Sequence, residues 1–256
     1  MAAPFWIGTS WKMNKTLAEA AEYTRAIAGA EPLRDPRIRP FVIPPFTALA
    51  RVCAELAASP VLVGAQNMHW AERGAFTGEV SPLMVADCGA DIVELGHSER
   101  REYFNETDAA VNRKVLAALE HGLRPLVCIG ETAEERRLGV AVETVVRQAK
   151  IALHGVDGEP LDRVLIAYEP VWAIGEHGRP ATPEDVSEIH DHLSALLPKR
   201  SNGERVPLLY GGSVNPDNAS VLAALPAVDG LFIGRSAWSA SGYLGLVEQV
   251  LAVIGD

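Results

Sequence analysis

Glu169 is the residue whose setting points most directly to chemistry. It follows the apolar run Val164-Leu165-Ile166 and precedes Pro170, which ends a strand, and Gly175 stands six residues further on. A carboxylate at the mouth of a buried strand, followed by a segment with the hinge residues of a lid, can act as a general base kept away from water. The alternative is an ordinary solvated carboxylate at a strand end.

Two further residues stand at similar transitions. His97 lies in Gly96-His97-Ser98-Glu99-Arg100-Arg101, where the N–H groups of a starting helix can keep an imidazole neutral. Lys12 lies in Trp11-Lys12-Met13-Asn14, just after the first apolar run, where a lysine is as often a simple surface charge. A histidine is usually structural, and that is the expectation for the six others: His69, His121, His154, His177, His190 and His192.

Glycine-rich turns supply a candidate anion site. Tyr210-Gly211-Gly212-Ser213-Val214 and the later Gly234-Arg235 follow apolar runs, and backbone N–H groups in such turns can bind a dianion. Either turn alone is a weak signal because such turns are common. The sequence contains no Walker motif, no dinucleotide fingerprint and no His-Glu-x-x-His motif, so neither a cofactor nor a metal is expected.

The elements that must position these residues alternate along the chain. Helical patterns separate the strand-like runs, for example Val186–Leu197 after the capping sequence Thr182-Pro183-Glu184-Asp185. This alternation predicts one α/β domain over residues 1–256, a (β/α)₈ barrel of eight parallel strands with functional residues at the strands' carboxyl ends. The expected strands are Phe5–Gly8, Pro40–Ile43, Val61–Gly64, Asp91–Leu95, Pro125–Ile129, Val164–Ala167, Pro207–Tyr210 and Gly230–Ile233.

Composition narrows the class of protein. A net charge of −10 argues against a nucleic-acid surface, and any anion site must therefore be locally positive. The apolar runs are shorter than the ~18–20 residues that span a bilayer, so no membrane association is expected. The start lacks the pattern of a secretory signal, and three cysteines without metal-like spacing suggest free thiols in a reducing cytoplasm.

In their order along the chain, these motifs resemble the triosephosphate isomerase family from end to end. The resemblance implies a TIM barrel and an intramolecular oxidoreductase that interconverts phosphorylated ketoses and aldoses by proton transfer through an enediolate, without a cofactor. It implies that Glu169 is the base, that His97 polarises the carbonyl, and that Lys12 attracts the phosphate and stabilises the enediolate. Glu99 would pair with Lys12, and the resemblance places Ser10 and Cys128 in supporting positions.

The resemblance also implies a phosphate cradle, a lid and a dimer. Gly175, Ser213, Gly234 and Arg235 would form the cradle, and the lid would be Glu176, His177, Gly178, Arg179, Pro180 and Ala181. The third loop would contain Gly64-Ala65-Gln66-Asn67-Met68 and Gly74-Ala75-Phe76-Thr77-Gly78-Glu79-Val80 and would reach a second subunit. Thr77 would lie near the partner's active-site loop, and Glu79 would pair with the partner's Arg100 across a homodimer interface. An apolar loop tip bearing Met68, Trp70 and Phe76 favours such an interface over an ordinary surface loop.

Three positions depart from the family's usual pattern. Ser10 replaces an asparagine, the lid is one residue longer and contains Pro180, and Arg235 replaces the second glycine of the phosphate turn. The smaller Ser10 leaves space beside the reacting carbons, where a hydroxymethyl group would fit. With Ser10 and Met68-His69-Trp70, the chain looks like the branch of the family assigned to L-erythrulose 1-phosphate. The resemblance implies that the product is D-erythrulose 4-phosphate and that the enzyme belongs to erythritol catabolism.

Other functions stay open on sequence alone. Ordinary triosephosphate isomerase, the glycolytic enzyme acting on dihydroxyacetone phosphate, is the nearest alternative. A synthase or lyase on the same scaffold would need other groups, such as a Schiff-base lysine inside the barrel. A non-catalytic sugar-phosphate-binding protein would be expected to have lost Glu169 or His97, and both are present.

Overall fold

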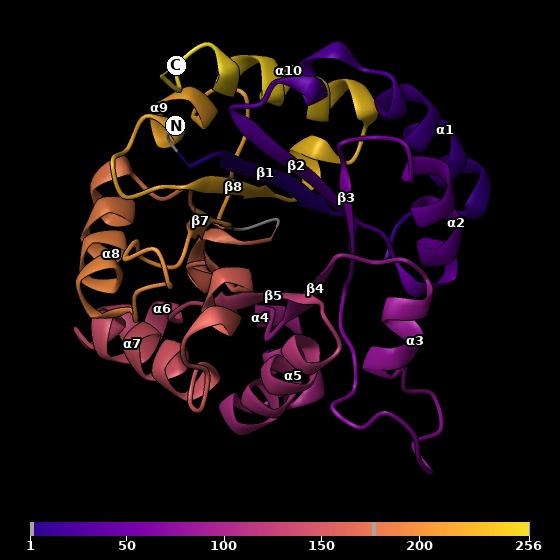
Figure 1. The fold of residues 1–256 in the computed structure, drawn as a ribbon. Helices are drawn as coiled ribbons and strands as arrows, with labels where there is room; N and C mark the ends of the chain where they lie inside the picture. Colours follow the sequence, from indigo (N-terminus) through magenta and orange to yellow (C-terminus); the bar gives the residue numbers. More distant parts are fainter. Residues whose placement is uncertain (1–2, 176–177, 256) are drawn as a thin grey trace.

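Eight parallel strands close into a barrel, with β1 paired to both β2 and β8 (Figure 1). The computed structural model describes residues 3–175 and 178–255. The predicted (β/α)₈ barrel is confirmed. Its strands are β1 (Phe5–Ser10), β2 (Ile38–Ile43), β3 (Leu62–Ala65), β4 (Ile92–Leu95), β5 (Arg124–Ile129), β6 (Leu165–Tyr168), β7 (Leu208–Tyr210) and β8 (Gly230–Ile233).

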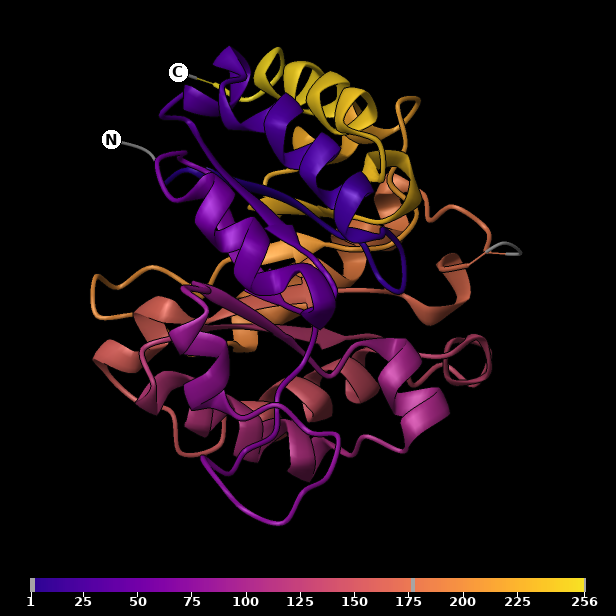
Figure 2. The ribbon, with the colours of Figure 1, turned by 90° about the vertical axis from the view of Figure 1, so that its right-hand side faces the viewer.

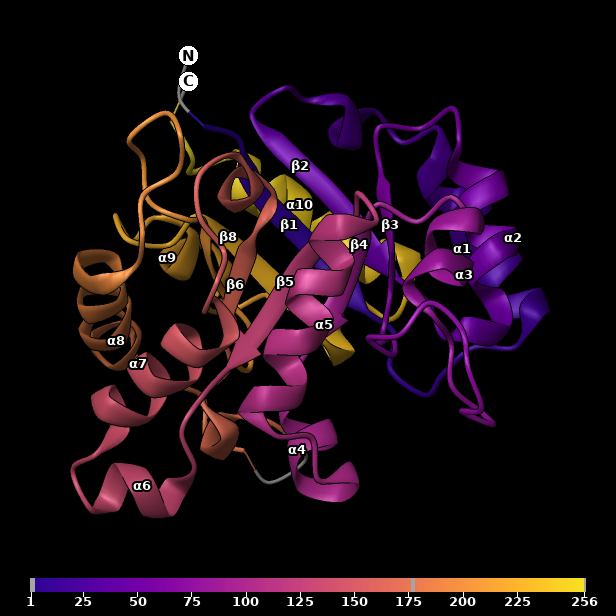
Figure 3. The same ribbon diagram turned by 60° about the horizontal axis from the view of Figure 1, so that its bottom comes forward.

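Helices surround the barrel, and most begin at a side chain that caps them. Thr16, Thr132 and Thr182 each form a reciprocal capping box at a helix start, which satisfies N–H groups that lack helical partners. Figure 3 shows α5 lying across β4 and β5, as its contacts require. The helices are α1 (Leu17–Ala28), α2 (Phe46–Leu56), α3 (Pro82–Asp87), α4 (Ser98–Phe104), α5 (Asp108–Glu120), α6 (Ala133–Arg137), α7 (Ala141–Ala152), α8 (Pro183–Leu196), α9 (Ala219–Ala223) and α10 (Ala240–Leu251).

Short 3₁₀ helices complete the connections, and two of them follow strand ends directly. These are η3 (Val171–Ala173), after β6, and η4 (Arg235–Ala237), after β8. The other two, η1 (Glu31–Arg34) and η2 (Glu159–Arg163), precede β2 and β6. Within the described residues, no helix is both long enough and apolar enough to cross a membrane.

The strands divide the buried apolar side chains into two layers. One fills the barrel itself and includes Phe41, Leu126 and Phe232. The other lies between the strands and the helices and includes Ile7, Val93 and most of the buried residues. Because both faces of every strand are covered, the strands consist of continuous apolar runs. A polar side chain that enters the inner layer therefore stands out.

The carboxyl ends of the strands bring the predicted site residues to one rim. Ser10 ends β1, and His97, Glu169, Gly211 and Gly234 follow β4, β6, β7 and β8 within two residues of the strand end. Most predicted strand boundaries differ from the observed ones by one or two residues, and β8 coincides. The long segment between β3 and α3 projects away from the barrel (Figure 2).

Gly8 offers a direct test of packing inside the barrel. A Cβ atom built at Gly8 would lie 2.4 Å from atoms of the Phe41 ring, which stacks on Phe232 and so has little room to move. We expect Gly8→Ala to lower the free energy of unfolding by about 1–3 kcal/mol because it overpacks the inner layer.

Urea unfolding measures this change, and Gly245→Ala is the matched control. Gly245 lies on an exposed face of α10, and a Cβ atom there would have nothing within 4 Å, so the same substitution should stabilise the protein by about 0.5–1 kcal/mol. A Gly8→Ala protein as stable as the parent would contradict the packing described for the inner layer.

Candidate active site

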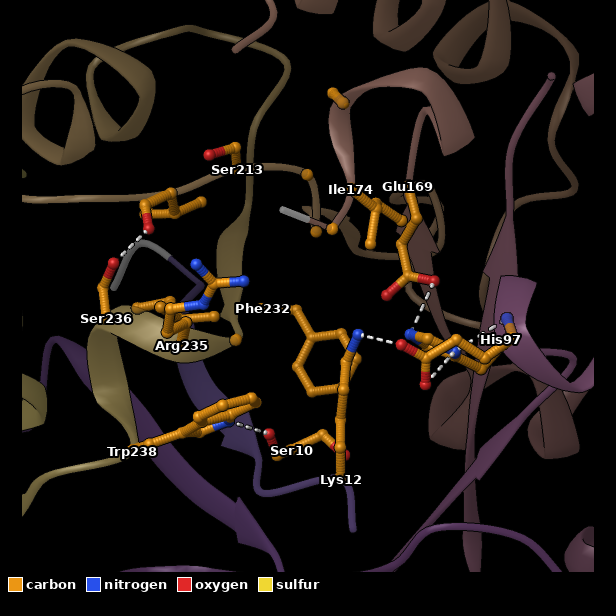
Figure 4. A pocket seen from close by; sticks show the side chains of 18 residues that line it. Ser10, Lys12, His97, Glu169, Ile174, Ser213, Phe232, Arg235, Ser236 and Trp238 are labelled. Atoms are coloured by element: carbon orange, nitrogen blue, oxygen red, sulfur yellow. Dashed lines mark hydrogen bonds and ion pairs between the residues drawn. The ribbon is translucent and has the colours of Figure 1, made fainter. Parts of the chain in front are cut away.

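A cavity of about 360 Å³ opens at the carboxyl ends of the strands (Figure 4). It has two sides. Glu169 and His97 lie on one side, and Ser213, Arg235 and Ser236 lie on the other. The remaining lining residues include Ser10, Lys12, Glu99, Ala173, Ile174, Gly175, Gly211, Gly212, Val214, Phe232, Ile233, Gly234 and Trp238. Phe232 and Trp238 were not among the site residues predicted from the sequence.

Lys12 is held in an uncommon backbone conformation at the cavity. Its φ of 52° lies in the left-handed region, which is costly for a residue with a side chain and is frequently found at functional sites. Two side-chain hydrogen bonds stabilise this turn: Asn14 donates to the Trp11 carbonyl, and Gln66 donates to the Lys12 carbonyl. Lys12 Nζ donates to Glu99 Oε1 at 2.7 Å, as the resemblance implied.

His97 is a neutral imidazole whose hydrogen-bonding roles are set by its position. It caps the start of α4, where its Nδ1 accepts the Glu99 backbone N–H at 3.2 Å. Since Nδ1 is the acceptor, the proton of the neutral ring resides on Nε2. Burial, with the charge of Lys12 adding to it, lowers the pKa of His97 from 6.5 to about 4. The imidazole can therefore donate a hydrogen bond from Nε2 at neutral pH.

Glu169 is buried at the mouth of the barrel, only 3% exposed. Its Oε2 lies 3.7 Å from His97 Nε2 and has no hydrogen-bond partner among the described residues. Burial raises the pKa of Glu169 well above its usual range, the negative charge of Glu94 raises it further, and Lys12 opposes the rise. A carboxylate in this setting is a stronger base than one in water.

Glu94 is a second buried carboxyl group beside the first, and it was not predicted from the sequence. It lies in β4, is 3% exposed, and accepts a hydrogen bond from Ser10 Oγ at 2.8 Å. Its Oε1 lies 4.0 Å from His97 Nε2. Burial raises the pKa of Glu94 to about 7. A charged residue inside the apolar run Ile92-Val93-Glu94-Leu95 was the available signal.

Cys128 adjoins both carboxyl groups. One ligand atom from each of Glu94, Cys128 and Glu169 lies within 4.8 Å of the others, which makes this the one candidate metal cluster among the described residues. Burial and the charge of Glu169 raise the pKa of the Cys128 thiol well above its usual range. Metal ligands must be deprotonated, and burial raises the pKa of all three groups, so the set is poorly suited to holding a metal ion.

The four residues predicted for the phosphate cradle all line the cavity. These residues are Gly175, Ser213, Gly234 and Arg235, and Figure 4 shows Ser213 and Arg235 across the cavity from Glu169. Ser236 Oγ donates to the Val214 carbonyl at 2.9 Å, which ties the turn after β8 to the turn after β7. The two glycine-rich turns therefore present their backbones to the same space.

The described part of the predicted lid returns to the segment that follows Glu169. Arg179 N donates to the Trp172 carbonyl at 3.2 Å, and the Arg179 guanidinium lies 5.3 Å from the Trp172 ring centre. Ala181 is buried. Glu176 and His177, also predicted for the lid, lie outside the described residues, and the roles of Gly178 and Pro180 stay predictions.

The third loop corrects one expectation. Met68 was predicted at an exposed apolar tip, but it is fully buried because it packs into the chain's own core between the strands and helices. Phe76 is 46% exposed, and Thr77 and Glu79 are exposed as well. Within its own chain, Arg100 Nε lies 3.4 Å from Glu106 Oε1.

Comparison with known proteins agrees with this geometry over almost the whole chain. The model of the triosephosphate isomerase family matches residues 5–250. A protein of Rhizobium etli named L-erythrulose-1-phosphate isomerase is 56% identical over 250 residues, 97% of this chain and 93% of the relative. Proteins of the same name from Rhizobium rhizogenes, 55% identical over 98% of this chain and 97% of the relative, and from Brucella abortus, 54% over 96% of both, are also similar. The chain therefore belongs to the triosephosphate isomerase family.

Proposed function

We propose that this protein isomerises L-erythrulose 1-phosphate to D-erythrulose 4-phosphate by cofactor-free proton transfer. The observation that carries the substrate assignment is the small Ser10, which lines the cavity and is hydrogen-bonded to the buried Glu94. The names of relatives 54–56% identical to this chain support the same substrate.

The proposed reaction moves one carbon-bound proton. Glu169 removes it from the carbinol carbon beside the ketone, and the C–H electron pair forms the double bond of an enediolate. His97 donates from Nε2 to the ketone oxygen and takes a proton from the neighbouring hydroxyl, so the carbonyl moves by one carbon. Glu169 then returns its proton to the former carbonyl carbon, and neither residue is changed at the end of the cycle.

The electrostatics of the cavity suit each proposed role. Glu169 must be ionised to act, and the nearby positive charge of Lys12 favours its ionised form. The same charge would stabilise the negative charge that develops on the enediolate. Because the imidazole of His97 is neutral, it can give and take protons between two oxygens that become similarly basic in the intermediate.

Two residues of the proposed phosphate site, Ser213 and Arg235, lie across the cavity from Glu169 and His97 (Figure 4). Gly175, Ser213, Gly234 and Arg235 form the site, and residues 178–181, the described part of the predicted lid, would close over it. Backbone N–H groups bind a dianion locally, which matters because the whole chain carries a net charge of −10. Binding of the phosphate would then supply the energy to close the lid and exclude water from Glu169.

Ordinary triosephosphate isomerase is the second candidate function. Lys12, His97, Glu99 and Glu169 would act in the same way on dihydroxyacetone phosphate, which lacks only the hydroxymethyl group of the four-carbon substrate. The observation that separates the two candidates is therefore Ser10, where the family usually has the larger asparagine.

We further propose that the protein is a homodimer formed through the third loop. Large apolar side chains stay exposed along this region and the neighbouring α3 and α4, at a cost in water that an interface would remove. They are Phe76 at 46%, Met84 at 56%, Tyr103 at 67% and Phe104 at 65% exposed.

Substitution of the proposed base is the first test. Glu169→Asp keeps the charge but withdraws it by one methylene, and a misplacement of that size is expected to lower kcat by ~100-fold. Glu169→Gln removes the base and should lower kcat further, while inorganic phosphate binds both variants as before. Turnover close to that of the parent in both variants would rule out the assignment.

A second prediction concerns substrate size. Ser10→Asn should refill the space beside the reacting carbons and lower kcat/KM for L-erythrulose 1-phosphate while sparing dihydroxyacetone phosphate. A change of this size in a pocket is worth roughly ten- to two-hundred-fold in the ratio of the two kcat/KM values. Ser10→Ala keeps the space open but removes the hydroxyl, so it separates the effect of volume from that of a hydrogen bond and should lower the ratio less than Ser10→Asn. An unchanged ratio in Ser10→Asn would remove the structural basis for a four-carbon substrate.

The protonation state of His97 gives a third prediction. In ¹⁵N NMR spectra the ring should stay neutral, with the proton on Nε2, from pH 8 down to about 5, because its pKa is lowered to about 4. The unfolded chain takes up this proton near pH 6.5, so His97 lowers stability as the pH falls from 6.5 toward 4. Protonation of the ring near pH 6.5 in the folded protein would contradict this prediction. The His97 ring signals are assigned as those missing from the spectrum of His97→Gln.

The proposed dimer predicts the state of the protein in solution. Light scattering at micromolar concentration should give twice the mass of one chain, and Phe76→Glu should shift the equilibrium toward monomer by placing a charge in the interface. Leu138→Glu is the control, because Leu138 is also exposed, at 60%, but lies after α6. A fully active monomer of the parent protein would overturn the proposal.

A further inference from the structure

Glu94 places a carboxyl group inside the barrel, where burial is unfavourable for stability. It belongs to the strand β4, whose other residues are apolar and buried, and a carboxyl group in such a place costs free energy unless it is paired. The described structure gives it no salt bridge to a lysine or arginine. Its close polar neighbours are Ser10 Oγ at 2.8 Å, His97 Nε2 at 4.0 Å, and the Cys128 and Glu169 side chains.

The hydrogen bond between Ser10 and Glu94 fixes the orientation of the Ser10 hydroxyl group. Ser10 lines the cavity, whereas Glu94 lies behind it. Ser10 Oγ carries one proton, and that proton is donated to Glu94 Oε2. The lone pairs of Ser10 Oγ stay available to accept a hydrogen bond from a group in the cavity. The Ser10 backbone is held as well, because its carbonyl accepts from Trp238 Nε1 at 3.0 Å.

We propose that Glu94 is a positioning residue for the four-carbon substrate: by accepting the Ser10 proton, it holds the serine hydroxyl as an acceptor for the substrate's terminal hydroxymethyl O–H. The inference rests on the proposed function. Dihydroxyacetone phosphate has no hydroxymethyl group in this place, so the bond favours the four-carbon phosphate alone. A cavity that merely left space would accommodate the larger substrate without selecting it.

A second effect of Glu94 has to be separated from the first. Its negative charge also raises the pKa of Glu169, which changes the rate with any substrate that Glu169 deprotonates. That effect is common to both substrates and cancels in the ratio of kcat/KM for L-erythrulose 1-phosphate to kcat/KM for dihydroxyacetone phosphate. A purely structural role for Glu94 would likewise change both substrates together.

The test measures this ratio in two unbranched variants of similar length. Glu94→Met cannot accept the Ser10 proton well, and loss of one oriented hydrogen bond is expected to lower the ratio by about three- to tenfold. Glu94→Gln retains a carbonyl oxygen that can accept the proton, so it should preserve most of the ratio. Because Glu94 acts through Ser10, Glu94→Met should change the ratio little further when Ser10 is already alanine.

Glu131→Gln is the matched control. Glu131 is another buried carboxyl group near the site, bonded to Tyr168 and Trp172 instead of Ser10, so its substitution should change both substrates alike. An unchanged ratio in Glu94→Met, or an equal further loss in the Ser10→Ala background, overturns the inference while the proposed function stands. If the parent enzyme has no activity on L-erythrulose 1-phosphate, both the proposed function and this inference are wrong. Thermal unfolding shows that each variant is folded.

Discussion

The removal of the Glu169 carboxyl group from water is the constraint on which the rest of the site depends. A buried carboxyl group resists ionisation, and here a second one, Glu94, lies close enough to increase that resistance. The charge of Lys12, held in place by its ion pair with Glu99, opposes this resistance without removing it. In the proposed mechanism Glu169 must be both dry and ionised, and the charge of Lys12 favours its ionised form.

The barrel provides the geometry by bringing strand ends together from distant parts of the chain. The Glu169 N–H donates to the Ile129 carbonyl at 2.7 Å, which fixes its backbone to the neighbouring strand. Gly211 lies against the side chain, since a Cβ atom there would come within 2.7 Å of Glu169 Cγ. The side chain therefore has little freedom, and the proposed chemistry depends on a position that several strands define together.

The sequence predicted the barrel and the residues around the cavity because strand-to-helix transitions carry strong local signals. The predictions that failed concern one strand boundary and the directions in which two side chains point. β2 begins at Ile38, two residues before the predicted start, because pairing with Phe5 extends it. Met68 was placed at a surface because an apolar residue in a loop does not show which way it points. Glu94 was visible as a charge within an apolar strand, but only the closed barrel places it beside Ser10.

The most direct test of the proposed function compares two substrates with the unmodified enzyme. In a single preparation, kcat/KM is measured for L-erythrulose 1-phosphate and for dihydroxyacetone phosphate under the same conditions. We predict that the four-carbon phosphate is converted more efficiently and that D-erythrulose 4-phosphate is the product. A clear preference for dihydroxyacetone phosphate would contradict this and identify the cavity around Ser10 as that of an ordinary triosephosphate isomerase.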